Sequence, residues 1–172
     1  VGLDTLVACD CPGCGVHAFE PDPVPLVFLR RNLRGRDCTI VDRAVGDGRD
    51  GTTVSLDAYS ATAGVLPTHV KVDIEGYEID CLRGMESLLA GCRPILFIEF
   101  HERLIRERLR RPPEEIAAFF DTLLRHGYEV KYNGHVTAMR ARPDHTYDFT
   151  WSDRKPNDDL FALVATPTRA PA

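Results

Sequence analysis

Short apolar runs rich in β-branched residues alternate with segments of helical periodicity, and this alternation limits the chain to few folds. Val16–Phe19 is followed by leucines at positions 26, 29 and 33, and Val70–Ile74 by apolar residues at positions 79, 82, 85 and 89. Two strands joined by a helix can lie parallel in one sheet, because the helix carries the chain back to the starting edge. The alternation therefore predicts an α/β fold with a largely parallel sheet and helices on both faces.

The remaining segments fit the same plan. Apolar residues from Ile116 to Leu124 form one stripe of a helix, and Asp22 before Pro23 predicts a capped helix N-terminus. A hairpin-like excursion is expected at Thr52–Leu56, after a cluster of glycines and aspartates. Further strands are expected at Cys38–Asp42, Pro94–Ile98, Tyr128–Tyr132 and Leu160–Ala165.

Composition bounds the class of protein. The chain has 172 residues, of which 44% are apolar and 27% charged, so we expect one globular domain over residues 1–172. Its net charge of −5 argues against nucleic acid as a partner. No apolar run approaches the roughly 18 residues of a membrane span, and no basic segment opens a signal peptide. We expect a soluble cytoplasmic protein with no membrane partner, whose oligomeric state the sequence does not predict.

The cysteines are unevenly spread. Cys9, Cys11 and Cys14 crowd into C-D-C-P-G-C, and the other three lie singly in apolar or helical stretches. The crowded three could be ligands of a soft metal ion, but zinc sites usually add a second pair of similar spacing. We favour a cysteine-rich turn and buried thiols, and so predict no metal site there.

Acidic residues follow the predicted strands. All of the following fall at the ends of predicted strands: Glu20, Asp42, Asp73 with Glu75, and Glu99 with His101. Ligands of parallel sheets bind beyond the carboxyl ends of the strands, where unliganded acids carry a desolvation cost. These residues predict a binding site at that edge. Some acids have a simpler explanation, since Glu78 at a helix start favours the helix dipole.

An ordered set of motifs carries a family likeness. The set comprises Phe19-Glu20-Pro21, Ala44-Val45, Leu56-Asp57, the K-V-D-I-E-G-Y-E block at 71–78, L-R-G-M at 82–85 and I-E-F-H at 98–101, and it thins to Gly127-Tyr128 and Asp159-Leu160-Phe161. In that order they resemble the FkbM-type S-adenosylmethionine-dependent methyltransferases.

The resemblance implies a doubly wound, mostly parallel, seven-stranded Rossmann-like sheet, with S-adenosylmethionine laid across its middle. Glu20 would bind the two ribose hydroxyls, and the segment with Asp42 and Ala44 would flank the adenine. Arg43 stands where family members often carry Asn. Asp73 would lie beside the methyl group that is transferred.

The family pattern opens with a strand and a loop of the type D-x-G-A-N-x-G, of which this sequence matches only the end. Gly2 would be the last glycine of that loop, and Thr5 the hydroxyl after it. The resemblance therefore implies an N-terminally truncated methyltransferase domain that lacks its first strand and most of the glycine loop. The sheet would then have to close a gap or leave backbone groups unpaired.

Transfer of a methyl group to a hydroxyl calls for a base. His101 is the candidate, and Asp73 could orient it or act as the base itself. Glu75, Glu99 and Asp73 could instead gather a magnesium ion. We predict an O-methyltransferase for a small-molecule or glycan acceptor, and the alternative is a non-catalytic, degenerate α/β module.

Two further segments have a plain and a functional interpretation. The five arginines between 103 and 111 could be a solvated helix face or could meet an anionic acceptor. The loop from Arg140 to Asn157, with His145 and Trp151, could be an acceptor-binding flap or a surface loop packed by its own aromatic side chains.

Overall fold

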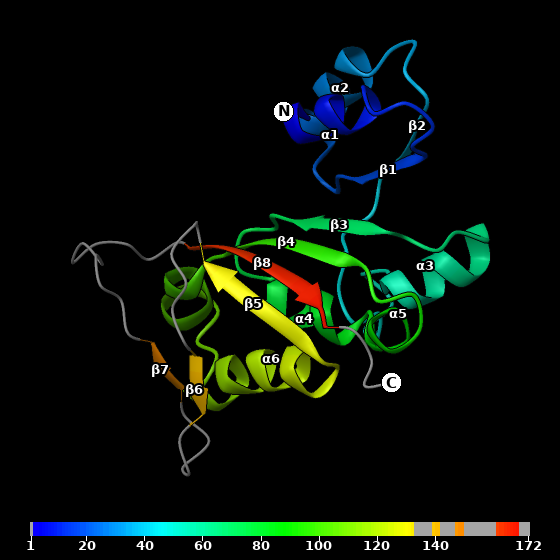
Figure 1. Cartoon of the computed structure of the whole chain (residues 1–172). Coiled ribbons are helices and arrows are strands. Elements are labelled where there is room, and N and C mark those ends of the chain that lie inside the picture. Colours follow the sequence, from blue (N-terminus) through cyan, green and yellow to red (C-terminus); the bar gives the residue numbers. More distant parts are fainter. Residues whose placement is uncertain (1, 133–138, 142–146, 150–160, 169–172) are drawn as a thin grey trace.

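The computed structural model describes residues 2–132, 139–141, 147–149 and 161–168 (Figure 1). In chain order its elements are α1 (Leu3–Cys9), β1 (Val16–Phe19), α2 (Pro23–Asn32), β2 (Cys38–Val41), α3 (Leu56–Ala63), β3 (His69–Val72), α4 (Glu78–Arg83), α5 (Glu86–Ala90), β4 (Ile95–Phe100), the π-helix η1 (Leu104–Arg108), α6 (Pro113–Arg125), β5 (Tyr128–Tyr132), β6 (Met139–Ala141), β7 (Tyr147–Phe149) and β8 (Phe161–Pro167). Most of the 140–157 loop, including His145 and Trp151, lies outside the described residues. Within the described part of the chain, no helix is both long and apolar enough to cross a bilayer.

The strands form separate sheets instead of the expected single seven-stranded one. β1 pairs with β2 in parallel, and the larger sheet has the order β3-β4-β8-β5. Within the larger sheet β3 and β4 are parallel, but β8 runs antiparallel to both β4 and β5. The α/β class is therefore confirmed, while the mostly parallel seven-stranded arrangement is not. Among the described residues β1 pairs only with β2, and β3 only with β4, so no strand joins the two sheets.

The main core lies on one face of the larger sheet. The apolar run of β4 buries Leu96, Ile98 and Phe100 on that face, as expected for alternate residues of a strand. Figure 1 shows α4, α5 and α6 together on the same side of the sheet. Phe100 packs against Phe119 and Phe120 of α6, with ring centroids 4.7 and 5.5 Å apart. This packing confirms the apolar stripe predicted for α6, although Leu124 at its edge is 40% exposed.

The N-terminal elements have a smaller core of their own. Leu29 of α2 and Leu33, its C-cap, pack with Ala18 of β1. α2 begins as the sequence predicts, because Asp22 Oδ1 accepts a 2.8 Å hydrogen bond from the Val24 N–H. Tyr59 of α3 connects this unit to the rest, since its hydroxyl lies 2.7 Å from His17 Nδ1.

The hairpin-like excursion expected at Thr52–Leu56 is not formed. A single parallel bridge joins Val45 to Val54, and α3 then begins at once. Ser55 ends the extended segment because its side chain accepts from the Ala58 N–H at 3.2 Å. The capping serine thus starts α3 at Leu56, the last residue of that run.

Candidate functional site

The carboxyl ends of β3 and β4 bring two predicted site residues together. The parallel register pairs Val72 with Ile98, so Asp73 and Glu99 continue it on adjacent strands. His101 follows Phe100, the last residue of β4. Asp73, Glu99 and His101 can each offer one ligand atom within 4.8 Å of the other two.

A tight turn after Asp73 shapes this site. Glu75 has a φ of 53° and Gly76 a φ of 102°, both in the left-handed region. A β-carbon on Gly76 would lie 3.2 Å from Leu104 Cβ, so the close approach of η1 also favours glycine. The turn lets α4 begin at Glu78, directly behind the end of β3.

Lys71 supplies the positive charge of the acidic cluster. Its Nζ donates to Glu99 Oε1 at 2.5 Å and lies 3.7 Å from Asp73 Oδ2. The same ammonium lies 3.8 Å from Asp4 Oδ2 on α1, which brings the helix of Thr5 to the site. Lys71 was not among the predicted site residues, although it stands two residues before Asp73 in the K-V-D motif and alternate strand residues share a face.

His101 is a largely enclosed polar group at this edge, with a side chain 11% exposed. Its Nδ1 lies 2.8 Å from Glu78 Oε1. Its Nε2 lies 3.6 Å from Glu75 Oε2 and 3.9 Å from Asp73 Oδ1, which is too far for a hydrogen bond. The residue that contacts the ring is therefore Glu78, and the helix-dipole role given to Glu78 was incomplete.

The ends of β1 and β2 carry the second group of predicted residues. Phe19 pairs with Val41, so Glu20 and Asp42 continue the register on adjacent strands. Glu20 Oε1 accepts from the Asp22 N–H at 2.9 Å, and Asp42 pairs with Arg30 at 3.3 Å. The Ala44 carbonyl accepts from the Val54 N–H at 2.9 Å. Glu20 and Asp42 thus each have one polar partner in the part of the chain that the structure describes, and each keeps further acceptor capacity.

Gly2 has a structural reason to be glycine. It precedes α1 with a φ of 78°, and a β-carbon there would lie 2.5 Å from Leu29 Cδ1. Thr5, in the first half of α1, is partly buried. The predicted cofactor contacts of Gly2 and Thr5 stay predictions.

The cluster at the strand ends differs in one member from the magnesium site that was considered, which comprised Asp73, Glu75 and Glu99. His101 takes the place of Glu75 in the cluster, and the Glu75 side chain is 71% exposed. The ammonium of Lys71 already neutralises Glu99. Among the described residues, the sulfur atoms of Cys9, Cys11 and Cys14 do not come within 4.8 Å of one another as a set. Cys11 and Cys14 do contact, with 2.7 Å between their Sγ atoms.

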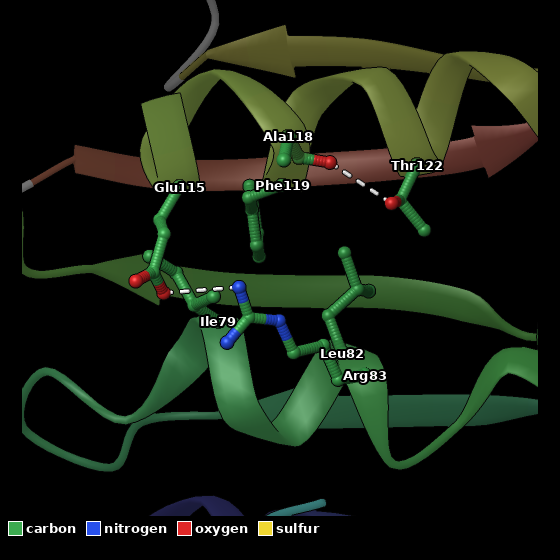
Figure 2. Close-up of a pocket in the computed structure, with 7 residues that line it drawn as sticks. All are labelled: Ile79, Leu82, Arg83, Glu115, Ala118, Phe119 and Thr122. Carbon is green, nitrogen blue, oxygen red and sulfur yellow. Dashed lines mark hydrogen bonds and ion pairs between the residues drawn. The ribbon is translucent and has the colours of Figure 1, made fainter. Parts of the chain in front are cut away.

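A small pocket lies between α4 and α6, away from the strand ends (Figure 2). Arg83 of α4 donates to Glu115 of α6 across it, at 2.9 Å. Arg111 reaches the same carboxylate at 3.0 Å and Asp80 at 2.5 Å. This network ties the two helices together, so Arg111 serves packing and is not available to an anionic acceptor.

Almost half of the chain, including the ends of β3 and β4, matches a known protein family. Residues 52–130 match the family described as the Methyltransferase FkbM domain. The motifs from Leu56-Asp57 to Gly127-Tyr128, with Asp73 and His101, fall inside the match, and the resemblance is confirmed for this part of the chain. Glu20, Asp42 and Ala44 lie outside it. No curated protein matches the chain in sequence.

Solved structures show a similar fold at low sequence identity. The methyltransferase FkbM of Methylobacillus flagellatus is 19% identical with a TM-score of 0.50, over 87% of this chain and 36% of its own. The precorrin-6y C5,15-methyltransferase of Geobacter metallireducens is 14% identical with a TM-score of 0.49, over 91% of this chain and 69% of its own. This chain therefore spans little more than a third of the FkbM structure, and the fold is what the two share.

Proposed function

We propose that this chain is a module of an S-adenosylmethionine-dependent methyltransferase that methylates a hydroxyl group. The observation that carries the proposal is the set of Asp73, Glu99 and His101 at the adjacent ends of β3 and β4, inside the segment that matches the family. An α/β sheet binds its ligands beyond the carboxyl ends of its strands, which is where these side chains lie.

The donor and acceptor groups of the chain fit the cofactor. Of the two Glu20 oxygens, Oε1 is engaged by the Asp22 N–H, while no described residue contacts Oε2, which can accept from a ribose hydroxyl. The Asp73 carboxylate has only long ion contacts, at 3.7 and 3.9 Å, so its lone pairs can serve an ammonium or sulfonium group. Glu20, Asp42 and Ala44 would hold the nucleoside end, and Gly2, Thr5 and Asp73 the methionine end.

Methylation of a hydroxyl group requires a residue that accepts the proton of that hydroxyl. When bound, S-adenosylmethionine would supply a methyl group on a sulfonium: the carbon–oxygen bond to the acceptor would form as the methyl–sulfur bond broke, and the electron pair would stay on sulfur. His101 Nε2 takes the proton that the acceptor hydroxyl loses. Lys71 limits the negative charge of Glu99 and Asp73 beside the imidazole. Alignment of the acceptor supplies the rest of the rate enhancement.

One observation favours a second route. Asp73, Glu99 and His101 together offer two carboxylates and an imidazole, a set that could hold a divalent ion if Lys71 moved away from Glu99. Under this alternative the metal lowers the pKa of the acceptor hydroxyl and His101 is a ligand instead of a base.

The test is a screen of sugars, hydroxylated metabolites and their phosphates that reads out S-adenosylhomocysteine, with and without a chelator. We expect turnover with at least one hydroxyl acceptor, no effect of the chelator, and a loss of about 10²–10⁴-fold in His101→Ala. His126→Ala is the matched control, because His126 also pairs with a glutamate, Glu86, at 2.9 Å but lies at the C-cap of α6. Inhibition by the chelator would favour the metal route, and full activity of His101→Ala would remove it as the base.

A further inference from the structure

Glu78 is buried to a degree that is rare for a carboxylate. Its side chain is 0% exposed, and it lies at the start of α4 among core residues such as Ile79 and Leu82. Moving an ionised carboxylate out of water costs several kcal/mol unless good partners compensate. A helix start can be served by an exposed acid or a serine at no such cost. Helix capping therefore does not explain why this carboxylate is inside.

The partners of Glu78 compensate only part of that cost. Oε1 accepts from the Gly76 N–H at 3.0 Å and contacts His101 Nδ1 at 2.8 Å. Oε2 is buried, and no described residue gives it a hydrogen bond. No described lysine or arginine pairs with Glu78, although Arg83 and Arg111 pair with the neighbouring Asp80. The contact that distinguishes this carboxylate is the one with the imidazole.

The two nitrogens of His101 face different surroundings. Nδ1 points inward to the buried Glu78, and Nε2 lies toward Glu75 and Asp73, whose side chains are 71% and 40% exposed. When Nδ1–H donates to a carboxylate, the neutral ring carries its lone pair on Nε2. That lone pair is then directed to the strand-end site, where an acceptor proton would arrive.

We propose that Glu78 is a positioning residue that fixes the orientation and tautomer of His101, so that Nε2 is the proton-accepting atom at the strand-end site. The proposal deepens the proposed function and rests on it for its catalytic meaning. Gly76 contributes through its backbone, because its N–H holds Oε1 from the second side. A buried carboxylate that fixes a base in this way is a known solution in other enzymes.

The first test measures the tautomer directly and needs no acceptor. Nitrogen chemical shifts of the His101 ring, at a pH where the imidazole is neutral, report which nitrogen carries the proton. We expect the Nδ1–H form in the wild-type chain and in Glu78→Gln, whose amide oxygen still accepts a hydrogen bond, and its loss in Glu78→Met, which has no acceptor. An Nε2–H form or an equal mixture in the wild type, or no change in Glu78→Met, would overturn the proposal. Glu86→Gln is the control, because it alters the exposed Glu86–His126 pair and leaves His101 alone.

Stability and turnover separate positioning from a structural role. Because Glu78→Met leaves the Gly76 N–H and the His101 ring without their acceptor, we expect it to lower the melting temperature, whereas Glu78→Gln keeps that acceptor and should stay close to the wild type. Below its melting temperature, we expect the kcat of Glu78→Met to fall, by up to the roughly 10²–10⁴-fold that a general base contributes, at nearly unchanged KM, and Glu78→Gln to keep most of the activity. Unchanged kcat in folded Glu78→Met would make Glu78 structural. If the acceptor screen fails, the tautomer measurement still decides the positioning claim.

Discussion

Asp57 is expected to be a stabilising residue that acts across the fold. It lies in the first turn of α3, but its two carboxylate oxygens accept from the Ser87 N–H at 2.8 Å and the Leu88 N–H at 2.9 Å. These are the second and third residues of α5, whose own N-cap, Met85, provides no side-chain hydrogen bond. Asp57 therefore caps α5 from another helix, and the Leu-Asp motif of the sequence has a structural explanation.

The cost of losing this cap can be estimated from its two hydrogen bonds. Loss of a single capping side chain costs about 0.5–2 kcal/mol, and a hydrogen bond to a charged group contributes about 1.5–3 kcal/mol. Asp57 is only partly buried, which favours the lower values. We expect Asp57→Ala to lower the free energy of unfolding by about 1–2 kcal/mol, and Asp57→Asn, which keeps one acceptor oxygen, by roughly half as much.

Urea denaturation followed by circular dichroism measures these changes. Asp121→Ala is the control, because it removes the same carboxylate from an exposed position of α6, where we expect a change within about 0.5 kcal/mol. A loss below that value in Asp57→Ala would refute the long-range cap. Equal losses in Asp57→Ala and Asp121→Ala would show that charge, and not capping, is responsible.

Three further predictions concern the cofactor and the thiols. Glu20→Gln should lose about 1–3 kcal/mol of S-adenosylmethionine affinity, measured by calorimetry, at unchanged thermal stability. Glu114→Gln on α6 is the control, and a loss of stability in Glu20→Gln at unchanged affinity would contradict the cofactor role of Glu20. A chain extended upstream of Val1 by a strand and a D-x-G-A-N loop should bind the cofactor more tightly, because such a strand can pair between β1 and β3, and equal affinity would contradict this. Burial raises the pKa of Cys81 to about 12 and that of Cys38 to about 11, while Cys11 is exposed. Alkylation of the folded chain at pH 8 should therefore modify Cys11 first and leave Cys81 unmodified, and rapid labelling of Cys81 would contradict its burial.

Local signals in the sequence predicted the elements that depend on local chemistry. The Asp22-Pro23 pair fixes the start of α2, and the stripe of α6 places Phe119 and Phe120 in the core. Capping and periodicity act over one or two turns, so they can be recognised without knowing the rest of the fold. The positions of Asp73 and His101, directly after β3 and β4, were predictable because the apolar runs of these strands are also local signals.

Other features depend on contacts between distant segments. The antiparallel insertion of β8 between β4 and β5 depends on how strands 30 or more residues apart choose partners, which apolar runs do not specify. The burial of Glu78 depends on the end of β4 lying over the start of α4, and the sequence shows only an acid in a first helical turn. The long-range cap by Asp57 was hidden in the same way.

The most direct test of the account is hydrogen exchange of the chain with and without saturating S-adenosylhomocysteine. The cofactor is assigned to the carboxyl ends of β1 and β3, so its product should slow exchange of backbone amides in residues 20–22 and 73–78. Amides of α6, none of whose residues is proposed to contact the cofactor, should exchange as before. Protection confined to α6 or to the pocket between α4 and α6, or no protection at any concentration of the ligand, would contradict the proposed cofactor site.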